Sequence, residues 1–130
     1  MTDLDHVVRI GLLFDYYGSL LTARQREAID LYYLRNWSLQ EMAETWQTSR
    51  QAAHDLVGRS ARILEAYERR LGFEARDRDI RRALGDCAGR IDEARRAAGC
   101  DAQKTGEALD AAAGIIAGLL GADENVAGVI

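Results

Sequence analysis

The fold of this chain is decided by residues 38–57, which read SLQEMAETWQTSRQAAHDLV. Ser38 and Glu41 form a capping-box pattern, in which each side chain can bond the backbone N–H of the other residue. The helix that this box opens has room for about two turns. A new helix is expected to begin directly after Thr48 and Ser49. Either hydroxyl can accept a hydrogen bond from the unpaired backbone amides in the first turn of that helix. Two short helices joined in this way predict a helix-turn-helix, whose second helix enters the DNA major groove in proteins that use the motif for DNA binding.

Further helices are expected on both sides of this motif. Apolar residues recur at helical spacing over residues 4–17, which predicts a first helix. Thr22 and Gln25 form a second capping box that opens a helix over residues 22–34. The second helix of the motif continues without a breaker over residues 50–71. The sequence therefore predicts an all-α fold, with two helices before the helix-turn-helix and an additional helical segment after it.

The composition changes after Gly72, where two amphipathic helices are expected, separated at Gly99 and Asp101. Their apolar stripes are Ile80, Leu84, Cys87, Ile91, Ala94 and Ala98 in the first helix, and Leu109, Ala112, Ala113, Ile116, Leu119 and Leu120 in the second. These stripes must be buried either on the preceding helices or on a second copy, which would give a homodimer through residues 75–121. The expected organisation is a helix-turn-helix domain over 1–73, C-terminal helices over 74–121 and a frayed tail over 122–130.

Composition and charge exclude several classes of function. The chain has 130 residues and a formal net charge of -4, which disfavours strong non-specific binding to nucleic acid. There is no apolar run long enough to span a bilayer, and the acidic first residues do not resemble a secretory signal. Cys87 and Cys100 have no histidines beside them that would complete a zinc site, so we expect reduced thiols in a cytoplasmic protein. No catalytic constellation, phosphate loop or metal cluster is recognisable, so neither an enzyme nor a cofactor is predicted.

The candidate DNA-binding residues lie on the second helix of the motif. With Ser49 as the cap, Ala53 and Val57 face inward. The side chains that then project from the exposed side of the first two turns are Arg50, Gln51, His54 and Asp55. Arginine and glutamine suit bidentate contact with base edges, and arginines further along a helix more often meet phosphate. Residues 48–72 carry five arginines against three carboxylates, a local charge of +2. The predicted DNA-contacting residues are Ser49, Arg50, Gln51, His54, Arg59 and Arg62.

An alternative interpretation treats the same arginines as solvated surface charges that pair with nearby carboxylates. Asp55 favours it, because a carboxylate facing phosphate is repelled unless it accepts from a cytosine amine or pairs with Arg59 at i+4. Arg24, Arg26 and Arg35 are further candidates for contacts to the DNA backbone.

About half of the chain resembles a known family. The matching motifs are LFDYYGSLLTARQ (13–25), LYYL (31–34), WSLQEMAE (37–44), SRQAA (49–53) and LEAYERRL (64–71). They resemble the YlxM family, small bacterial proteins with a fold like region 4 of sigma factors. The chain differs from the family's usual pattern at Thr48, His54 and Gly58, and it matches poorly after residue 73.

The resemblance implies a DNA-binding domain and a role in regulating or assisting the signal recognition particle pathway. Two hypotheses follow. The first is a regulator that binds double-stranded DNA in a sequence-specific manner. The second is a protein-interaction module that binds the protein or RNA of the signal recognition particle and uses the helix-turn-helix as a scaffold. A weaker third hypothesis is action with RNA polymerase through the two helices of residues 22–46.

Overall fold

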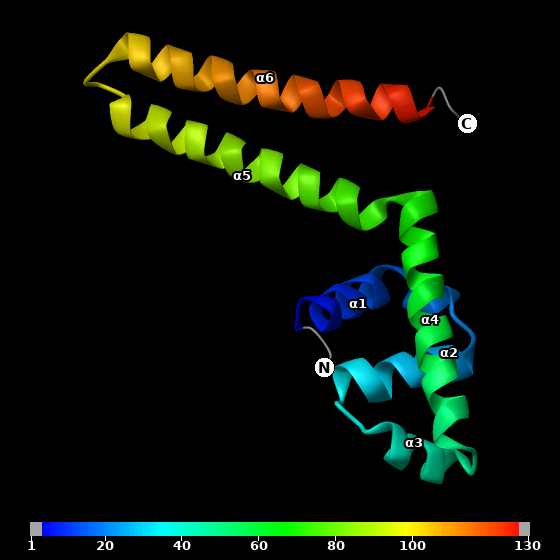
Figure 1. Ribbon diagram of the computed structural model, residues 1–130. Helices are drawn as coiled ribbons and strands as arrows, with labels where there is room; N and C mark the ends of the chain where they lie inside the picture. The colour runs from blue at the N-terminus through cyan, green and yellow to red at the C-terminus, as the bar shows by residue number, and fades with distance from the viewer. Residues whose placement is uncertain (1–3, 128–130) are drawn as a thin grey trace. The chain divides into compact units, whose positions relative to one another are not determined.

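The computed structural model describes residues 4–127, with side chains described as far as Gly121 (Figure 1). This part of the chain is helical throughout apart from short connections, so the all-α prediction is confirmed. The elements are α1 (Leu4–Tyr17), a 3-10 turn η1 (Gly18–Leu20), α2 (Ala23–Ile29), a π-helical segment η2 (Asp30–Leu34), α3 (Leu39–Trp46), α4 (Arg50–Leu71), α5 (Phe73–Ala97) and α6 (Ala102–Ala127). No helix within the described residues combines the length and the apolar character needed to cross a membrane.

The chain divides into two compact units, one ending at Ala75 and the other beginning at Arg76. In the first unit, the long helix α4 packs against α1, α2 and α3. Its apolar side is built as the sequence predicts, with Ala53, Val57 and Leu64 all buried. The first of two buried clusters comprises Ile10, Leu13, Tyr17, Leu21, Ile29, Ala61 and Leu64. The second cluster comprises Ala28, Leu31, Met42, Ala43, Ala53 and Val57, and it joins the helix-turn-helix to the rest of the unit.

The segment that precedes α3 departs from the regular helix expected over residues 22–34. The capping box at its start is present, because the Gln25 amide donates to the Thr22 hydroxyl at 3.3 Å and the Thr22 amide donates to the Gln25 side chain at 3.0 Å. From Asp30 onward the helix widens into a π turn, in which the Arg35 amide donates to the Asp30 carbonyl five residues earlier, at 2.9 Å. Asn36 then adopts a left-handed conformation with φ 57. Together these features set the direction in which the chain enters α3.

The corner between α4 and α5 is held by a buried carboxylate. Gly72 ends α4 in a left-handed conformation with φ 64, and α5 begins at the next residue. Glu68, which is 7% exposed, accepts from the backbone amides of Glu74 at 3.2 Å and Ala75 at 3.0 Å. The Tyr17 hydroxyl also donates to Glu68 and accepts from the Phe73 amide at 3.0 Å. Glu68 therefore caps the first turn of α5 from the preceding helix.

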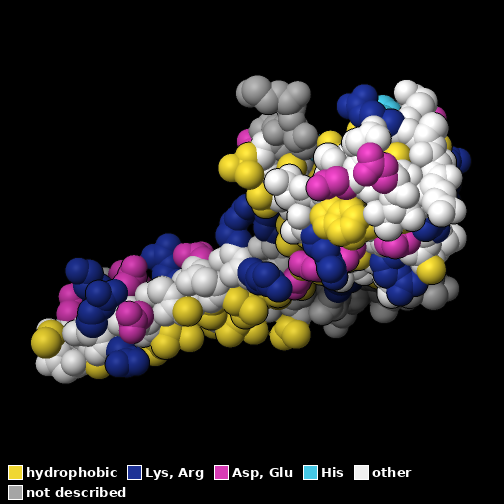
Figure 2. Space-filling view, turned by 90° about the horizontal axis from the view of Figure 1, so that it is seen from below, with side chains coloured by type: hydrophobic (Ala, Val, Ile, Leu, Met, Phe, Trp, Pro, Cys, Tyr) yellow, Lys and Arg dark blue, Asp and Glu magenta, His cyan; other side chains and the backbone are white. Residues whose placement is uncertain are grey.

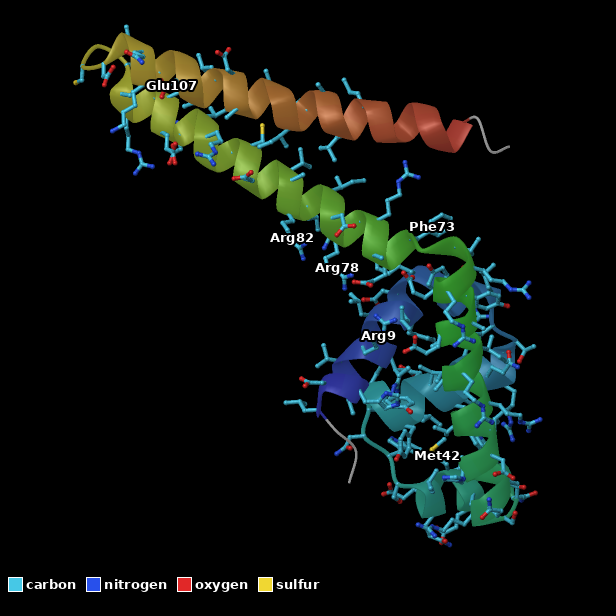
Figure 3. All side chains as sticks on the ribbon, turned by 45° about the horizontal axis from the view of Figure 1, so that its top comes forward. Arg9, Met42, Phe73, Arg78, Arg82 and Glu107 are labelled. Carbon is cyan, nitrogen blue, oxygen red and sulfur yellow. The ribbon has the colours of Figure 1, made fainter. Side chains whose placement is uncertain are left out.

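Hydrogen bonding at this corner keeps Glu68 ionised. Burial alone would raise the pKa of its carboxyl. The hydrogen bonds from Tyr17 and from the two backbone amides, together with the positive charge of Arg9, outweigh burial and hold the pKa of Glu68 below its usual value. Arg9 also forms a two-bond pair with Glu65, at 3.0 Å for each bond, and lies 3.6 Å from Glu74 (Figure 3).

The second unit is a hairpin in which α6 runs antiparallel to α5 (Figure 1). Gly99 lies in the connecting turn with φ 84, and the Asp101 carboxylate accepts from the Lys104 amide at 3.1 Å, so the predicted helix start at Asp101 is confirmed. The expected end near Gly121 is wrong, because α6 continues to Ala127 through residues that contain no proline. Residues 128–130 of the expected frayed tail lie outside the described part of the chain.

The predicted apolar stripes of the hairpin are only partly buried. The seam between the helices contains Cys87, Ala94, Ala108 and Ala112, all less than 9% exposed. The Cys87 thiol lies 3.8 Å from the Ala112 carbonyl oxygen, which fixes the level at which the helices face each other. Five of the larger members of the stripes, Leu84, Ile91, Leu109, Ile116 and Leu120, are between 44% and 64% exposed, whereas Ile80 and Leu119 are partly buried. Among the described residues of the hairpin, only small side chains are fully enclosed in the seam.

Candidate nucleic-acid interface

Helices α3 and α4 form the helix-turn-helix that the sequence predicts. The Glu41 amide donates to the Ser38 hydroxyl at 3.1 Å, and the Ser38 amide donates to the Glu41 carboxylate at 2.8 Å. These hydrogen bonds lower the pKa of Glu41, the largest contribution coming from the Ser38 amide. Gln47 ends α3 in a left-handed conformation with φ 54, and the Thr48 amide then donates back to the Ala43 carbonyl at 3.0 Å.

The crossing of the two helices is closely packed. Met42, which is 0% exposed, lies beside Ala43 in the cluster that also contains Ala53 and Val57 of α4 (Figure 3). Ala43 is only 3% exposed, and its small side chain leaves room for the two helices to approach each other closely. This packing fixes the inner side of α4 and thereby determines which of its side chains face outward.

The first turns of α4 present a continuous polar face. Ser49 is the N-cap, since its hydroxyl accepts from the Ala52 amide at 3.0 Å. The six candidate residues are all exposed: Ser49, Arg50, Gln51, His54, Arg59 and Arg62. The structure thus gathers them on one accessible surface, and their contact with DNA stays a prediction. For Ser49, the structure shows a capping role that needs no DNA.

Asp55 is engaged within this face by its helical neighbours. The Gln51 side-chain amide donates to the Asp55 carboxylate at 2.9 Å, and the His54 ring nitrogen Nδ1 lies 3.6 Å from the same oxygen. Among the described residues, this acidic side chain is therefore held by Gln51 and His54 and not by Arg59. A protonated His54 would form an ion pair with Asp55 and reduce the repulsion between that carboxylate and a phosphate.

The arginines expected near the DNA backbone each have an internal contact. The Arg24 guanidinium lies 4.3 Å from the centre of the Trp46 ring and 3.2 Å from Glu27. Arg26 donates to the Leu21 carbonyl at 3.4 Å, and Arg35 pairs with Asp30 at 2.9 Å. A phosphate would have to compete with these contacts, and binding of any of these arginines to a DNA backbone stays a prediction.

A hollow beside the start of α4 was not predicted from the sequence. It has a volume of about 400 Å³, and its walls include Tyr32, Tyr33 and Trp37, with Arg50 at its edge. The two tyrosine rings meet edge to face with centroids 5.0 Å apart. All three aromatic residues are partly buried, and part of each lines this hollow. An aromatic wall beside an arginine suits contact with sugar or base surfaces next to the recognition helix.

Comparison with known proteins identifies the family. Residues 4–90 match the family model described as "Putative helix-turn-helix protein, YlxM / p13 like". The chain belongs to this family. The matched segment contains residues 4–75 of the first unit and continues along α5 to residue 90, and residues 91–130 lie beyond it.

Curated relatives support the assignment. The chain is 49% identical over 88 residues to UPF0122 protein STH1464 of Symbiobacterium thermophilum, which covers 68% of this chain and 82% of that protein. It is 47% identical over 68 residues to UPF0122 protein OB1530 of Oceanobacillus iheyensis, covering 52% of this chain and 65% of that relative. It is also 47% identical over 73 residues to UPF0122 protein BH2485 of Halalkalibacterium halodurans, covering 56% and 67%. In the second and third of these relatives the similarity spans little more than half of this chain.

Proposed function

We propose that this protein is a DNA-binding regulator that inserts the first turns of α4 into the major groove of double-stranded DNA. The observation that carries the proposal is the exposure of Arg50, Gln51 and His54 on the second helix of a helix-turn-helix. The opposite side of the same turns is anchored in the core by Ala53 and Val57. A rigidly anchored helix whose outer side offers arginine, glutamine and histidine can read base edges through paired hydrogen bonds.

Contacts to phosphate would be few, which implies modest affinity. Arg59 and Arg62 are exposed one and two turns beyond the base-reading residues, where they can neutralise phosphates. The overall charge of -4 opposes binding at long range, so a large electrostatic contribution is not expected. Regulation or assistance of the signal recognition particle pathway, as the family resemblance implies, is the biological role we propose for this binding.

Selection from random duplexes at low salt tests the proposal with four proteins. The wild type should enrich a sequence, and Arg50→Ala combined with Gln51→Ala should remove that preference. Arg59→Ala should weaken binding to all sequences. It should also reduce the salt slope, which is the steepness with which the logarithm of the binding constant falls with the logarithm of the salt concentration, by about 0.9, the contribution of one phosphate contact. Arg69→Ala is the matched control, because Arg69 is an exposed arginine near the far end of the same helix. Absence of enrichment for the wild type would refute sequence-specific binding.

A second candidate function is a protein-interaction module that binds components of the signal recognition particle. The exposed carboxylate of Asp55 and the missing side chain at Gly58 favour it, because both weaken the attraction of this surface for phosphate. Co-purification of the particle's protein or RNA with the wild type, and its loss in the Arg50→Ala, Gln51→Ala variant, would support this alternative. Recovery of neither component from native cells would count against it.

A further inference from the structure

The α5–α6 hairpin carries apolar residues that its own seam does not bury. We name Leu84, Ile91, Leu109, Ile116 and Leu120 the outer apolar face; each of these side chains is at least 44% exposed. Residues 108–121 of α6 contain one charged residue, Asp110, so this part of the helix is apolar or small around most of its circumference. A helix of that kind is normally buried on more than one side. In the hairpin, α6 is buried on one side only.

The outer apolar face lies on one side of the hairpin. Cys87 faces Ala112 across the seam. Leu84 and Ile91 lie three residues before and four residues after Cys87, and Leu109 and Ile116 have the same positions relative to Ala112. In two antiparallel helices with equal rise, this arrangement puts Leu84 level with Ile116, and Ile91 level with Leu109, on the same side. Figure 2 shows the hydrophobic side chains of the hairpin gathered in a band along one side.

We propose that the outer apolar face binds a second copy of this chain, so that two hairpins form a four-helix bundle. The equal spacing of its two Leu–Ile pairs makes the face approximately two-fold symmetric, as a self-complementary interface requires. Helices of about 30 Å at a separation of about 9 Å give this side of the hairpin an area of about 600 Å². That area is close to the roughly 800 Å² that each partner contributes to a stable interface.

The net charges of the two helices also fit a second copy. Residues 76–97 of α5 contain seven arginines and five carboxylates, whereas residues 102–121 of α6 contain one lysine and two carboxylates. The two helices therefore have opposite net charge, and packing α5 of one copy over α6 of the other brings opposite signs together. A membrane surface fits less well, because α6 offers it carboxylates and little positive charge.

Light scattering of the full chain, at concentrations from about 1 to 100 μM, tests the proposal in a range that covers micromolar dissociation constants. The wild type should show twice the 14.4 kDa mass of one chain. Ile116→Glu should weaken self-association at least about 100-fold, because it would bury an unpaired carboxylate. Leu84→Glu, on the other helix, should have the same effect. The matched control is Gly114→Glu, which adds the same charge on the Asp110 side of α6. A Cβ added at Gly114 has no atom within 4 Å, so this variant should remain a dimer.

Far-UV circular dichroism at the same concentrations shows whether each variant remains helical. The dimer also predicts that the thermal midpoint of the wild type rises with protein concentration, and that this rise is absent in Ile116→Glu. A wild type that stays monomeric at about 100 μM overturns the proposal, whether or not it sediments with vesicles of phosphatidylcholine and phosphatidylglycerol. Equal self-association of Ile116→Glu and Gly114→Glu also overturns it. None of these outcomes depends on DNA binding by α4.

Discussion

The two units of this protein bury very different side chains. In the first unit the fully buried side chains include large ones, among them Tyr17, Ile10 and Leu64. Among the described residues of the second unit, the buried ones are Cys87 and three alanines, and the leucines and isoleucines are exposed or only partly buried. Because stabilisation by burial grows with the apolar area removed from water, the first unit can hold its fold alone, and the hairpin gains little from its own seam. Both units form long helices, but only the first also buries large apolar side chains, so forming helices and forming a core are separate properties of this chain.

Core truncation should give the largest difference between the two units. Leu64→Ala removes a side chain that is 0% exposed and packed in the first cluster, so it should lower the free energy of unfolding by about 2–5 kcal/mol. Cys87→Ala, in the hairpin seam, should lower it by about 1 kcal/mol, because it deletes a single heavy atom. Urea denaturation followed by circular dichroism measures both. Similar losses in the two variants would show that the seam contributes as much as the core.

The contacts of Glu68 add to the comparison of the two units, because they stabilise the start of α5 through polar groups. At pH 7, Glu68→Gln should lower the free energy of unfolding by about 1.5–3 kcal/mol, since a buried ionised acceptor of several hydrogen bonds is lost. The folded-state pKa of Glu68 lies below its ordinary value, so this contribution is fully present above the ordinary carboxyl pKa. It is lost as the pH falls through the folded-state pKa.

The difference between wild type and Glu68→Gln should therefore shrink in acid. Unfolding curves at a series of pH values from about 7 to 3 measure it. Glu65→Gln is the matched control: its carboxylate pairs with Arg9 at a partly exposed position, so the loss should be at most about 1 kcal/mol. A Glu68→Gln effect that is the same at every pH would mean that the ionised carboxylate is not the source of the stability.

The sequence predicted local features of the first unit well. Both capping boxes, the Ser49 cap and the continuous helix to Leu71 were predicted, because each depends on side chains within a few residues of the backbone that they contact. The outward direction of Arg50 and Gln51 followed from the same local periodicity. The exposed positions of the candidate residues in this chain could therefore be predicted from its sequence, and their contact with DNA stays a prediction.

Features that depend on tertiary packing were missed. The π turn from Asp30 to Leu34 has the composition of an ordinary helix, and the hollow beside Trp37 is lined by residues from α1, η2, α3 and α4, which are far apart in the sequence. No local pattern in the sequence indicated that Glu68 would cap the following helix. The apolar stripes of α5 and α6 were read as single faces, whereas the structure divides them into a buried seam and an exposed band. A stripe more than about 100° wide can serve two neighbours, and its sequence does not show how they are divided.

The two helix caps of the motif test whether Ser49 acts only in folding. Ser38→Ala and Ser49→Ala should each lower the free energy of unfolding by about 1 kcal/mol, because each leaves a helix amide without its acceptor. Ser49→Asp should keep the stability, since aspartate is an equally good N-cap, and it should weaken DNA binding by adding a negative charge beside phosphate. Thermal unfolding and a duplex-binding titration measure the two effects. Unchanged DNA affinity in Ser49→Asp would place the end of α4 away from the DNA.

Substitutions at Gly58 should have the smallest effect on the free energy of unfolding. Two variants at this position can distinguish a change in helix stability from a new contact with phosphate. A Cβ at this position of α4 has no atom within 4 Å, so Gly58→Ala should raise the free energy of unfolding by about 0.5–1 kcal/mol through helix propensity alone. Gly58→Arg should give a similar gain in stability and, in addition, bind duplex DNA more tightly with a salt slope steeper by about 0.9. Gly58→Ala is the control, because it changes the propensity without adding charge. Tighter binding by Gly58→Arg together with an unchanged slope would mean that the new side chain meets no phosphate, and the docking of this side of α4 on the DNA backbone would then be wrong.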